Sequence, residues 1–489
     1  MSLQRYPPEV IAKALSHLDG YSLAKCRQVC HHLSKIIKSE VRLQYTLELC
    51  KSGMVDAPDS FEKQSIQERL DILREFIARR QNRAKTQNPS DVIITLPEDF
   101  RKAHHSGLFV SQRETENEVG LVDVSNLVPT GSKAERVFEE RRMTVDMQLA
   151  GRWDQNQICV DRDQDLIIIL SGSYQEYRQG LRFHLFSLSN GATHPLATLP
   201  FISWDDIAKR PGRLVFQIFD DLFVVCEYTA CEGPALIYNW KTGHRLLEFI
   251  DEAQAFVLFD SEHFMTCTWG AEDQCELQVR EIETSKIVVR LSLPRMLQKD
   301  EYFAQAEHFV QLLNGALPLP SRSTLSRQRR YPFHASPEAA IITLWIQNPT
   351  SDFITTISHS DLLNIMHTPK SSTDTNAISL SWGTWPQATF QWWGNHQPQR
   401  ISVYGRRLAI AADDDVKIFE FDNRWFKDSY ATRQVDDVSF TCVHRPRLVR
   451  WIDAHEWIDD IFLDEDFVVV VVRSGMTGRP ASETCIYCE

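Results

Sequence analysis

Residues 6–33 of the chain read YPPEVIAKALSHLDGYSLAKCRQVCHHL, and this stretch decides the fold of the N-terminal part. Pro7 and Pro8 suit the first turn of a helix, where backbone N–H groups have no intrahelical partner. Apolar residues with helical spacing follow: Val10, Ile11, Ala14, Leu15 and Leu18. Asp19-Gly20 is a turn signal that ends the segment. The stretch therefore opens with an amphipathic helix.

Two further helices are predicted before residue 52. Ser22 is expected to cap the second one, whose apolar residues also recur at helical spacing: Leu23, Cys26, Val29, Cys30, Leu33 and Ile37. A third helical stretch runs from about Ser39 to Lys51. Three short helices bury little surface by themselves, so such a unit needs a neighbour or a partner.

The order of these residues resembles the F-box family. That family opens with Leu-Pro-x-Glu, continues with an Ile-Leu-Ser-x-Leu helix and ends with Val-Cys-x-x-Trp. The matching segments here are Tyr6-Pro-Pro-Glu9, Ala14-Leu-Ser-His-Leu18 and Val29-Cys-His-His-Leu33. Tyr6 and Leu33 replace the usual Leu and Trp, and both keep apolar bulk. The N-terminal segment thus resembles that of F-box proteins of the fungal type.

The resemblance implies a docking module. In F-box proteins the helices bind Skp1, which bridges to cullin-1 and a ubiquitin-charged E2 enzyme. The positions that the resemblance assigns to Skp1 binding are Pro7, Pro8, Glu9, Val10, Leu15, Leu18, Leu23, Val29 and Cys30. An apolar patch on short helices suits coverage by a partner's helices. The alternative is that these apolar residues form the core of a small helical cap.

One more amphipathic helix is predicted within residues 61–87, with four apolar residues on one face: Ile66, Leu70, Leu73 and Ile77. We therefore expect an F-box at residues 1–50, a helical linker at 51–87 and a β domain at 88–489. The whole chain of 489 residues has a net charge of −13, although residues 1–87 carry 15 Lys and Arg against 10 Asp and Glu. The acidic excess lies in the predicted β domain.

From residue 88 short apolar runs alternate with turns rich in Asn, Asp, Gly and Pro. Examples of the runs are Leu166–Leu170, Leu222–Cys226 and Phe467–Val472. They predict strands, and no long helical period separates them. A loose repeat at Leu185, Tyr238 and Arg280 has intervals of 53 and 42 residues, near the blade period of propellers.

This pattern resembles degenerate WD40-type blades and predicts a β-propeller with about six to eight blades. A pair of β-sandwiches is the alternative. The fold class is therefore an α+β multidomain protein, in which a small all-α F-box precedes a large all-β domain.

Two features are candidates for binding a protein client. Arg327, Arg329 and Arg330 lie in a proline-containing stretch and can pair with phosphate or an acidic peptide. Trp392 and Trp393 lie close to two further tryptophans, and large rings can anchor a partner. The alternatives are an exposed loop for the arginines and packing inside a blade for the tryptophans.

The sequence shows no motif of a catalytic or cofactor site. It has no Gly-x-Ser-x-Gly elbow, phosphate-binding loop or His-Glu-x-x-His helix. Eleven irregularly spaced cysteines favour reduced thiols over a disulfide framework. Cys26 with Cys30 and Cys485 with Cys488 are separate pairs, each too small for a structural zinc site. We expect no catalytic residue, cofactor or metal.

The sequence also limits location and partners. No apolar stretch is long enough to span a membrane, and the N-terminus lacks the apolar core of a secretory signal. An acidic total argues against general nucleic-acid binding. We expect a cytoplasmic or nuclear protein that binds Skp1, cullin-1 through Skp1, and a protein client, with neither nucleic acid nor membrane as a partner.

The functional hypothesis is a non-catalytic adaptor of a cullin-type ubiquitin ligase, which holds a client near a charged E2. One alternative is a Skp1-bound scaffold that works outside ubiquitination. Another is a propeller enzyme, which requires convergent carboxylates or a histidine pair at the central channel.

Overall fold

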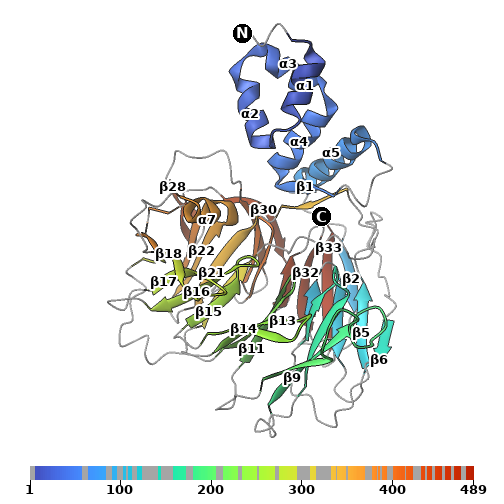
Figure 1. The fold of residues 1–489 in the computed structure, drawn as a ribbon, viewed down its shortest axis with the longest axis vertical. Coiled ribbons are helices and arrows are strands. Elements are labelled where there is room, and N and C mark those ends of the chain that lie inside the picture. Colours follow the sequence, from blue (N-terminus) through green and yellow to red (C-terminus); the bar gives the residue numbers. More distant parts are fainter. Residues whose placement is uncertain are drawn as a thin grey trace. The chain divides into compact units, whose positions relative to one another are not determined.

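The computed structural model in Figure 1 describes most of the chain. The described residues are 6–57, 64–83, 91–95, 103–105, 108–112, 118–123, 141–144, 158–171, 180–204, 213–228, 234–249, 253–269, 275–294, 309–314, 332–336, 339–347, 351–368, 377–382, 384–385, 388–393, 400–412, 415–421, 431–435, 438–442, 446–453, 458–463, 467–474 and 481–488. The chain divides into two compact units. A helical unit comprises residues 1–89 and 325–339, and a β unit comprises residues 90–324 and 340–488.

Four short helices open the helical unit: α1 Pro8–Leu15, α2 Gly20–Val29, α3 His31–Ser39 and α4 Val41–Ser52. Pro8 lies in the first turn of α1, where its missing N–H loses no hydrogen bond. Gly53 ends α4 with a φ of +66°, the left-handed conformation that glycine adopts without strain.

The second predicted helix was wrong in two respects. Its cap is Asp19 and not Ser22, because the Asp19 carboxylate accepts a hydrogen bond from the Ser22 backbone N–H at 2.7 Å. The predicted helix also breaks in two at Cys30, which has extended backbone angles and lies between α2 and α3.

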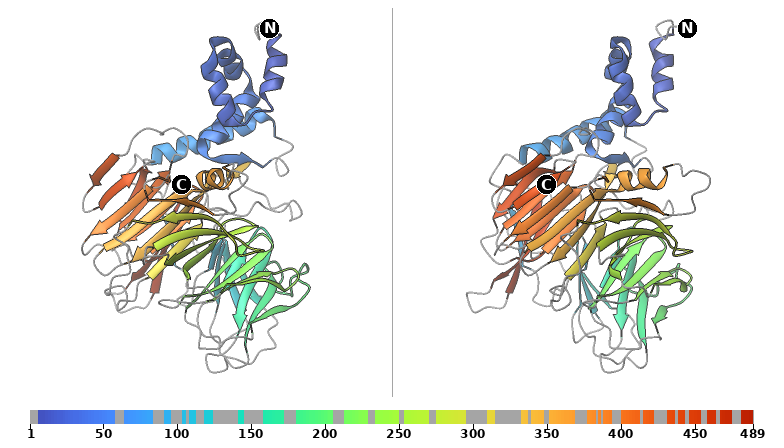
Figure 2. Two further views of the ribbon diagram at one scale, coloured as in Figure 1. Left: turned by 60° about the vertical axis from the view of Figure 1, so that its left-hand side comes forward. Right: turned by 90° about the vertical axis from the view of Figure 1, so that its left-hand side faces the viewer.

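Helix α4 is shared by two apolar cores. Leu43 and Leu47 belong to a first core with α1, α2 and α3, whereas Tyr45 and Leu49 belong to a second one. Each pair has i,i+4 spacing, which places its members on one side of the helix. The second core also contains residues of helix α5, Ile66–Arg83, and of strand β1, Met54–Asp56. Figure 2 shows α5, in lighter blue, crossing the direction of the darker α1–α4.

The helical unit also includes a strand from far along the chain. Strand β20, Phe333–Ala335, pairs antiparallel with β1, with Met54 opposite Ala335. The sequence prediction had assigned residues 325–339 to the β domain, within a proline- and arginine-rich loop. In the structure the described residues 332–336 pack within the helical unit instead.

Seven sheets occur among the described residues of the β unit. Three of them each take four consecutive strands. The first has β3 Ala103–His105, β4 Leu108–Gln112, β5 Glu118–Asp123 and β6 Arg141–Thr144. The second has β7 Ile158–Asp161, β8 Leu166–Ser171, β9 Leu181–Ser187 and β10 Phe201–Trp204. The third has β11 Arg213–Phe219, β12 Leu222–Tyr228, β13 Ala235–Asn239 and β14 His244–Phe249.

The next three sheets depart from this plan at their outer strands. One has β15 Ala253–Leu258, β16 His263–Trp269, β17 Cys275–Glu281 and β18 Ile287–Ser292, with β23 Ile378–Leu380 added parallel to β18. The next has β19 Phe309–Asn314, β21 Ile341–Gln347, β22 Ser351–Ser358 and β24 Ala388–Trp393, extended by β29 Val438–Cys442 and β28 Ala431–Val435. The sixth has β25 Arg400–Tyr404, β26 Arg407–Ala412, β27 Asp415–Phe421 and β30 Pro446–Asp453.

The seventh sheet joins strands from both ends of the β unit. Its strands are β31 Ile458–Leu463, β32 Phe467–Ser474, β33 Ala481–Cys488 and β2 Asp91–Thr95. Figure 1 shows blue β2 beside the red strands β33 and β32. A series of sheets in chain order, closed by pairing of the first strand with the last, is the architecture of a β-propeller. The propeller prediction is confirmed, with seven blades among the described residues.

Consecutive sheets bury apolar cores between them. In β8, Leu166 and Ile168 pack toward β11–β14, whereas Ile167 and Ile169 pack toward β3–β6. Successive side chains of a strand point to opposite faces, so a strand buried on both faces is apolar throughout. The unbroken run at Leu166–Leu170 has this cause.

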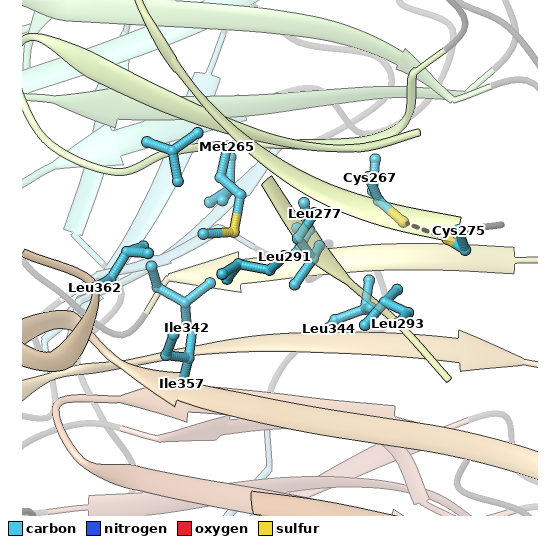
Figure 3. Packing of buried hydrophobic residues seen from close by; sticks show 14 of the residues in the cluster. Met265, Cys267, Cys275, Leu277, Leu291, Leu293, Ile342, Leu344, Ile357 and Leu362 are labelled. Atoms are coloured by element: carbon cyan, nitrogen blue, oxygen red, sulfur yellow. Dashed lines mark hydrogen bonds between the residues drawn. The ribbon is translucent and has the colours of Figure 1, made fainter. Parts of the chain in front are cut away.

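Figure 3 shows the same arrangement farther along the chain, where Met265 and Leu291 share a core with Ile342 and Leu344 of the next sheet. Helix α7, His359–Met366, follows β22 and adds Leu362 to this core. The residues of two consecutive sheets and one inserted helix therefore pack as one cluster.

Candidate docking surface

The first two helices and the residues beside them carry an unusual number of exposed apolar side chains. Of the described residues, nine large apolar ones are exposed, and five of them lie in the first 29 residues: Tyr6, Val10, Leu18, Tyr21 and Val29. Val29 is 73% exposed and Val10 is 54% exposed. Exposed apolar residues that recur within one small unit mark an interaction site, whereas single ones are ordinary.

Local structure explains where these side chains lie. Pro7 and Pro8 start α1, so Val10 lies in its first turn. Leu18 precedes the Asp19 cap of α2, and Val29 is the last residue of α2 before the extended Cys30. The exposed residues therefore lie at helix ends and in the turn between helices. Of the predicted docking residues, Pro7, Pro8, Glu9, Val10, Leu18, Val29 and Cys30 are exposed.

Two predicted docking residues lie elsewhere. Leu15 is 7% exposed and Leu23 is fully buried, and both pack in the first core with Ile11 and Ile37. Ile11 and Leu15 are four residues apart and lie on one side of α1, whereas Val10 lies to one side of them and faces solvent. Leu15 and Leu23 thus hold the helices together in the first core and are not exposed on the surface.

The same helices carry exposed charged side chains, among them the acids Glu9 and Asp19 and three cations. Lys13, Lys25 and Arg27 are exposed on α1 and α2. The Lys25 ammonium lies 4.1 Å from the centroid of the Tyr21 ring, a cation–π geometry. A partner that covers this surface is expected to place apolar residues at the centre and carboxylates at the rim.

A polar cluster fastens the second core of the helical unit. The Tyr45 hydroxyl donates to Asp56 Oδ1 at 2.8 Å, and Arg69 Nη1 lies 3.2 Å from both Asp56 oxygens. Burial, followed by the hydrogen bond to Asp56, raises the pKa of Tyr45 well above its usual value. The cluster joins α4, β1 and α5, and the Tyr45 hydroxyl stays protonated at neutral pH.

The predicted client-binding residues remain predictions. Arg327, Arg329 and Arg330 lie outside the described residues. Trp392 and Trp393 lie in strand β24, whose side chains at these positions are outside the description. Their neighbour Trp385 is 1% exposed in the core that also contains Leu277 and Leu291, and its indole N–H donates to the Ser292 carbonyl at 3.2 Å. Packing inside a blade is thus the role of Trp385.

In the part of the chain that the structure describes, no three His, Cys, Asp or Glu side chains gather to hold a metal ion. Cys267 and Cys275 are buried free thiols of β16 and β17 with their sulfur atoms 3.2 Å apart (Figure 3). The hydrogen bond with Cys275, followed by burial, raises the pKa of the Cys267 thiol, which therefore stays protonated.

Among the described helices, none combines the length and the apolar character that crossing a bilayer requires.

Short helices with exposed apolar residues thus precede a β-propeller in this chain. The family model for the F-box domain matches residues 7–45. The chain therefore carries an N-terminal F-box domain, and an F-box domain implies binding to Skp1. No curated protein matches the chain.

Several solved structures are similar to the chain at low identity. Sqt1 of Saccharomyces cerevisiae is 11% identical with a TM-score of 0.38, over 81% of this chain and 87% of that one. The C-terminal WD40 domain of Sif2 is 9% identical with a TM-score of 0.34, over 82% and 97%. BamB from Moraxella catarrhalis is 9% identical with a TM-score of 0.37, over 81% and 98%. The propeller assignment rests on the strand order and closure of this chain.

Proposed function

We propose that the chain is the substrate-recognition subunit of an SCF ubiquitin ligase. It binds Skp1 through the F-box helices, reaches cullin-1 through Skp1, and holds a protein client on the β unit. The observation that supports this proposal most directly is the group of exposed apolar residues on the F-box helices, Val10 and Val29 above all. Skp1 would cover these residues and remove them from water.

The subunit itself performs no bond chemistry in this mechanism. It holds the client where lysine side chains meet a ubiquitin-charged E2 repeatedly. Joining two proteins through one adaptor raises their effective concentration, and positioning turns a bimolecular encounter into one within a complex.

The test compares exposed apolar residues of the two units in the full-length chain. Val10→Asp and Val29→Asp are expected to weaken Skp1 binding by about tenfold or more each, because an anchor residue of an interface contributes more than 1.4 kcal/mol. Leu196→Asp is the matched control, since Leu196 is 51% exposed in the β unit. It should leave the affinity for Skp1 unchanged, as measured by titration calorimetry.

Three results would count against the proposal. Failure of the wild-type chain to bind Skp1 would contradict the proposed role of the F-box helices. Full Skp1 affinity in the Val29→Asp variant would contradict the proposed docking surface. If Skp1 binds but neither cullin-1 nor a ubiquitinated client purifies with the chain from its own cells, the scaffold alternative replaces the ligase.

A further inference from the structure

The second core of the helical unit contains Phe333, which lies in the sequence between the blade strands β19 and β21. Phe333 is 1% exposed and packs edge-on against Phe76 of α5, with the ring centroids 5.2 Å apart. It shares this core with Tyr45 and Leu49 of α4. Because a missing ring leaves a cavity, the core between α4 and α5 is incomplete without Phe333.

Backbone hydrogen bonds hold the segment at both ends. Strand β20 pairs with β1 along its full length. Before the strand, the Ala57 N–H donates to the Pro332 carbonyl at 2.9 Å, and after it the Ser336 N–H donates to the Gly53 carbonyl at 2.8 Å. The Tyr45 hydroxyl lies 3.3 Å from the same Pro332 oxygen.

Only a few residues separate the end of this segment from the β unit. Ser336 is bonded within the helical unit, whereas the Ile341 N–H donates to the Gly405 carbonyl at 2.8 Å within the β unit. Ile341 is also buried in a core of the β unit with Leu408 and Ile410. The five residues from Ser336 to Ile341 reach at most about 18 Å when fully extended.

We propose that residues 332–336 are a clasp, in which a segment between β19 and β21 completes the second core of the helical unit and leaves only the short stretch from Ser336 to Ile341 as a tether to the β unit. This inference rests on the proposed ligase function, because a fixed reach matters where a client must meet a charged E2. Phe333 is then a positioning residue that acts through β1 and α5. The helices α1 and α2, which carry the proposed docking surface, pack in the first core, and Phe333 packs in the second.

The first experiment measures amide hydrogen exchange of the full-length chain. Phe333→Ala should speed exchange in β1 and α5 by about tenfold or more, while α1, α2 and α3 keep their protection. Phe183→Ala is the control, because Phe183 is an equally buried ring in a core of the β unit. Unchanged exchange in α5 of the Phe333→Ala variant would overturn the clasp.

The second experiment lengthens the tether and leaves Phe333 in place. About 12 Gly and Ser residues are inserted between Pro337 and Glu338, and the same insertion between Ser372 and Thr373 is the control. The client is unidentified, so the readout is the set of the chain's own lysines that become ubiquitinated with Skp1, cullin-1 and an E2.

The insertion at 337 should enlarge this set of lysines at unchanged Skp1 affinity, whereas the control insertion should reproduce the wild-type set. An identical set in both variants, with Skp1 still bound, would overturn the clasp and leave the proposed function standing. Loss of Skp1 binding by the wild-type chain would defeat the proposed function itself.

Discussion

The helical unit and the β unit use their apolar side chains in opposite ways. Five of the nine exposed large apolar residues in the described chain lie in the first 29 residues, whereas the described residues of the much larger β unit include three, Leu196, Leu199 and Leu246. Apolar surface in water is unfavourable by about 25 cal/mol per Å². This difference between the described parts of the two units is what the proposed docking role of the F-box helices predicts.

The largest effect should come from a core shared by two blades. Trp240 is fully buried between β7–β10 and β11–β14, and its indole N–H donates to the Asp220 carbonyl at 2.9 Å. Trp240→Ala should lower the free energy of unfolding of the β unit by about 3–5 kcal/mol. All twelve tryptophans lie beyond residue 150, so intrinsic fluorescence during urea unfolding follows this unit.

Leu246→Ala is the control for that measurement, since Leu246 is 40% exposed on β14. It should change stability by less than about 0.5 kcal/mol. Equal losses of unfolding free energy in Trp240→Ala and Leu246→Ala would contradict the assignment of Trp240 to the core and of Leu246 to the surface.

A matched pair on one helix tests the contrast in the helical unit. Leu23 and Val29 both lie in α2, yet Leu23 is fully buried and Val29 is exposed. Leu23→Ala should destabilise the helical unit by about 2–5 kcal/mol, and Val29→Ala by less than about 0.5 kcal/mol. Far-UV circular dichroism against urea gives both values. If Val29→Ala were the more destabilising, Val29 would be a core residue and not part of a docking surface.

Acid should weaken the β unit through a buried histidine. Burial, assisted by Arg182, lowers the pKa of His184 to about 4, below the value of about 6.5 in an unfolded chain. Between these values the unfolded state binds the extra proton, so stability falls as the pH falls from 7 toward 4. The loss at pH 5 is at most about 2 kcal/mol. His184→Gln should flatten this part of the stability–pH curve, measured by fluorescence-detected unfolding.

His263 provides the opposite case in another blade. Its hydrogen bond to Asp260, with Nδ1 3.0 Å from Oδ1, raises its pKa, so its contribution is present in weak acid and lost as the pH rises through the raised pKa. His263→Gln should therefore steepen the decline in acid. Steepening by His184→Gln instead would contradict the assignment of His184 as a buried neutral group.

The smallest effect concerns the helix cap at the edge of the docking surface. Asp19→Ala removes the acceptor of the Ser22 N–H and should cost about 1 kcal/mol, whereas Asp19→Asn keeps an acceptor and should cost about half or less. Urea unfolding followed by circular dichroism separates the two. Equal stability of all three proteins would show that the helical unit does not depend on this cap.

The sequence predicted the helical F-box and the strands of the propeller well, for local reasons. Helical spacing between residues 8 and 52 and unbroken apolar runs such as Leu166–Leu170 are properties of short segments. Spacing alone did not separate Leu15 from Val10, because both are apolar residues of one short helix and tertiary packing decides which of them is covered.

The pairing of β20 with β1 had no local signal. Phe333-His-Ala335 is a short segment in a stretch rich in proline and arginine, and the Tyr45–Pro332 contact joins residues 287 positions apart. Such pairing depends on where the rest of the fold brings the segment, and strand formation is strongly context-dependent.

Closure of the propeller has a consequence for synthesis on the ribosome. Strand β2 begins at Asp91, and its partner β33 begins at Ala481. A ribosome that adds about 5–20 residues per second needs roughly 20–80 seconds to reach that partner. During this interval β2 has an unpaired edge, a template for wrong pairing with other nascent chains. A ribosome that stalls before residue 481 leaves the propeller unclosed, with β2 unpaired and available to aggregate with other chains. Closure of this propeller therefore depends on complete elongation of the chain.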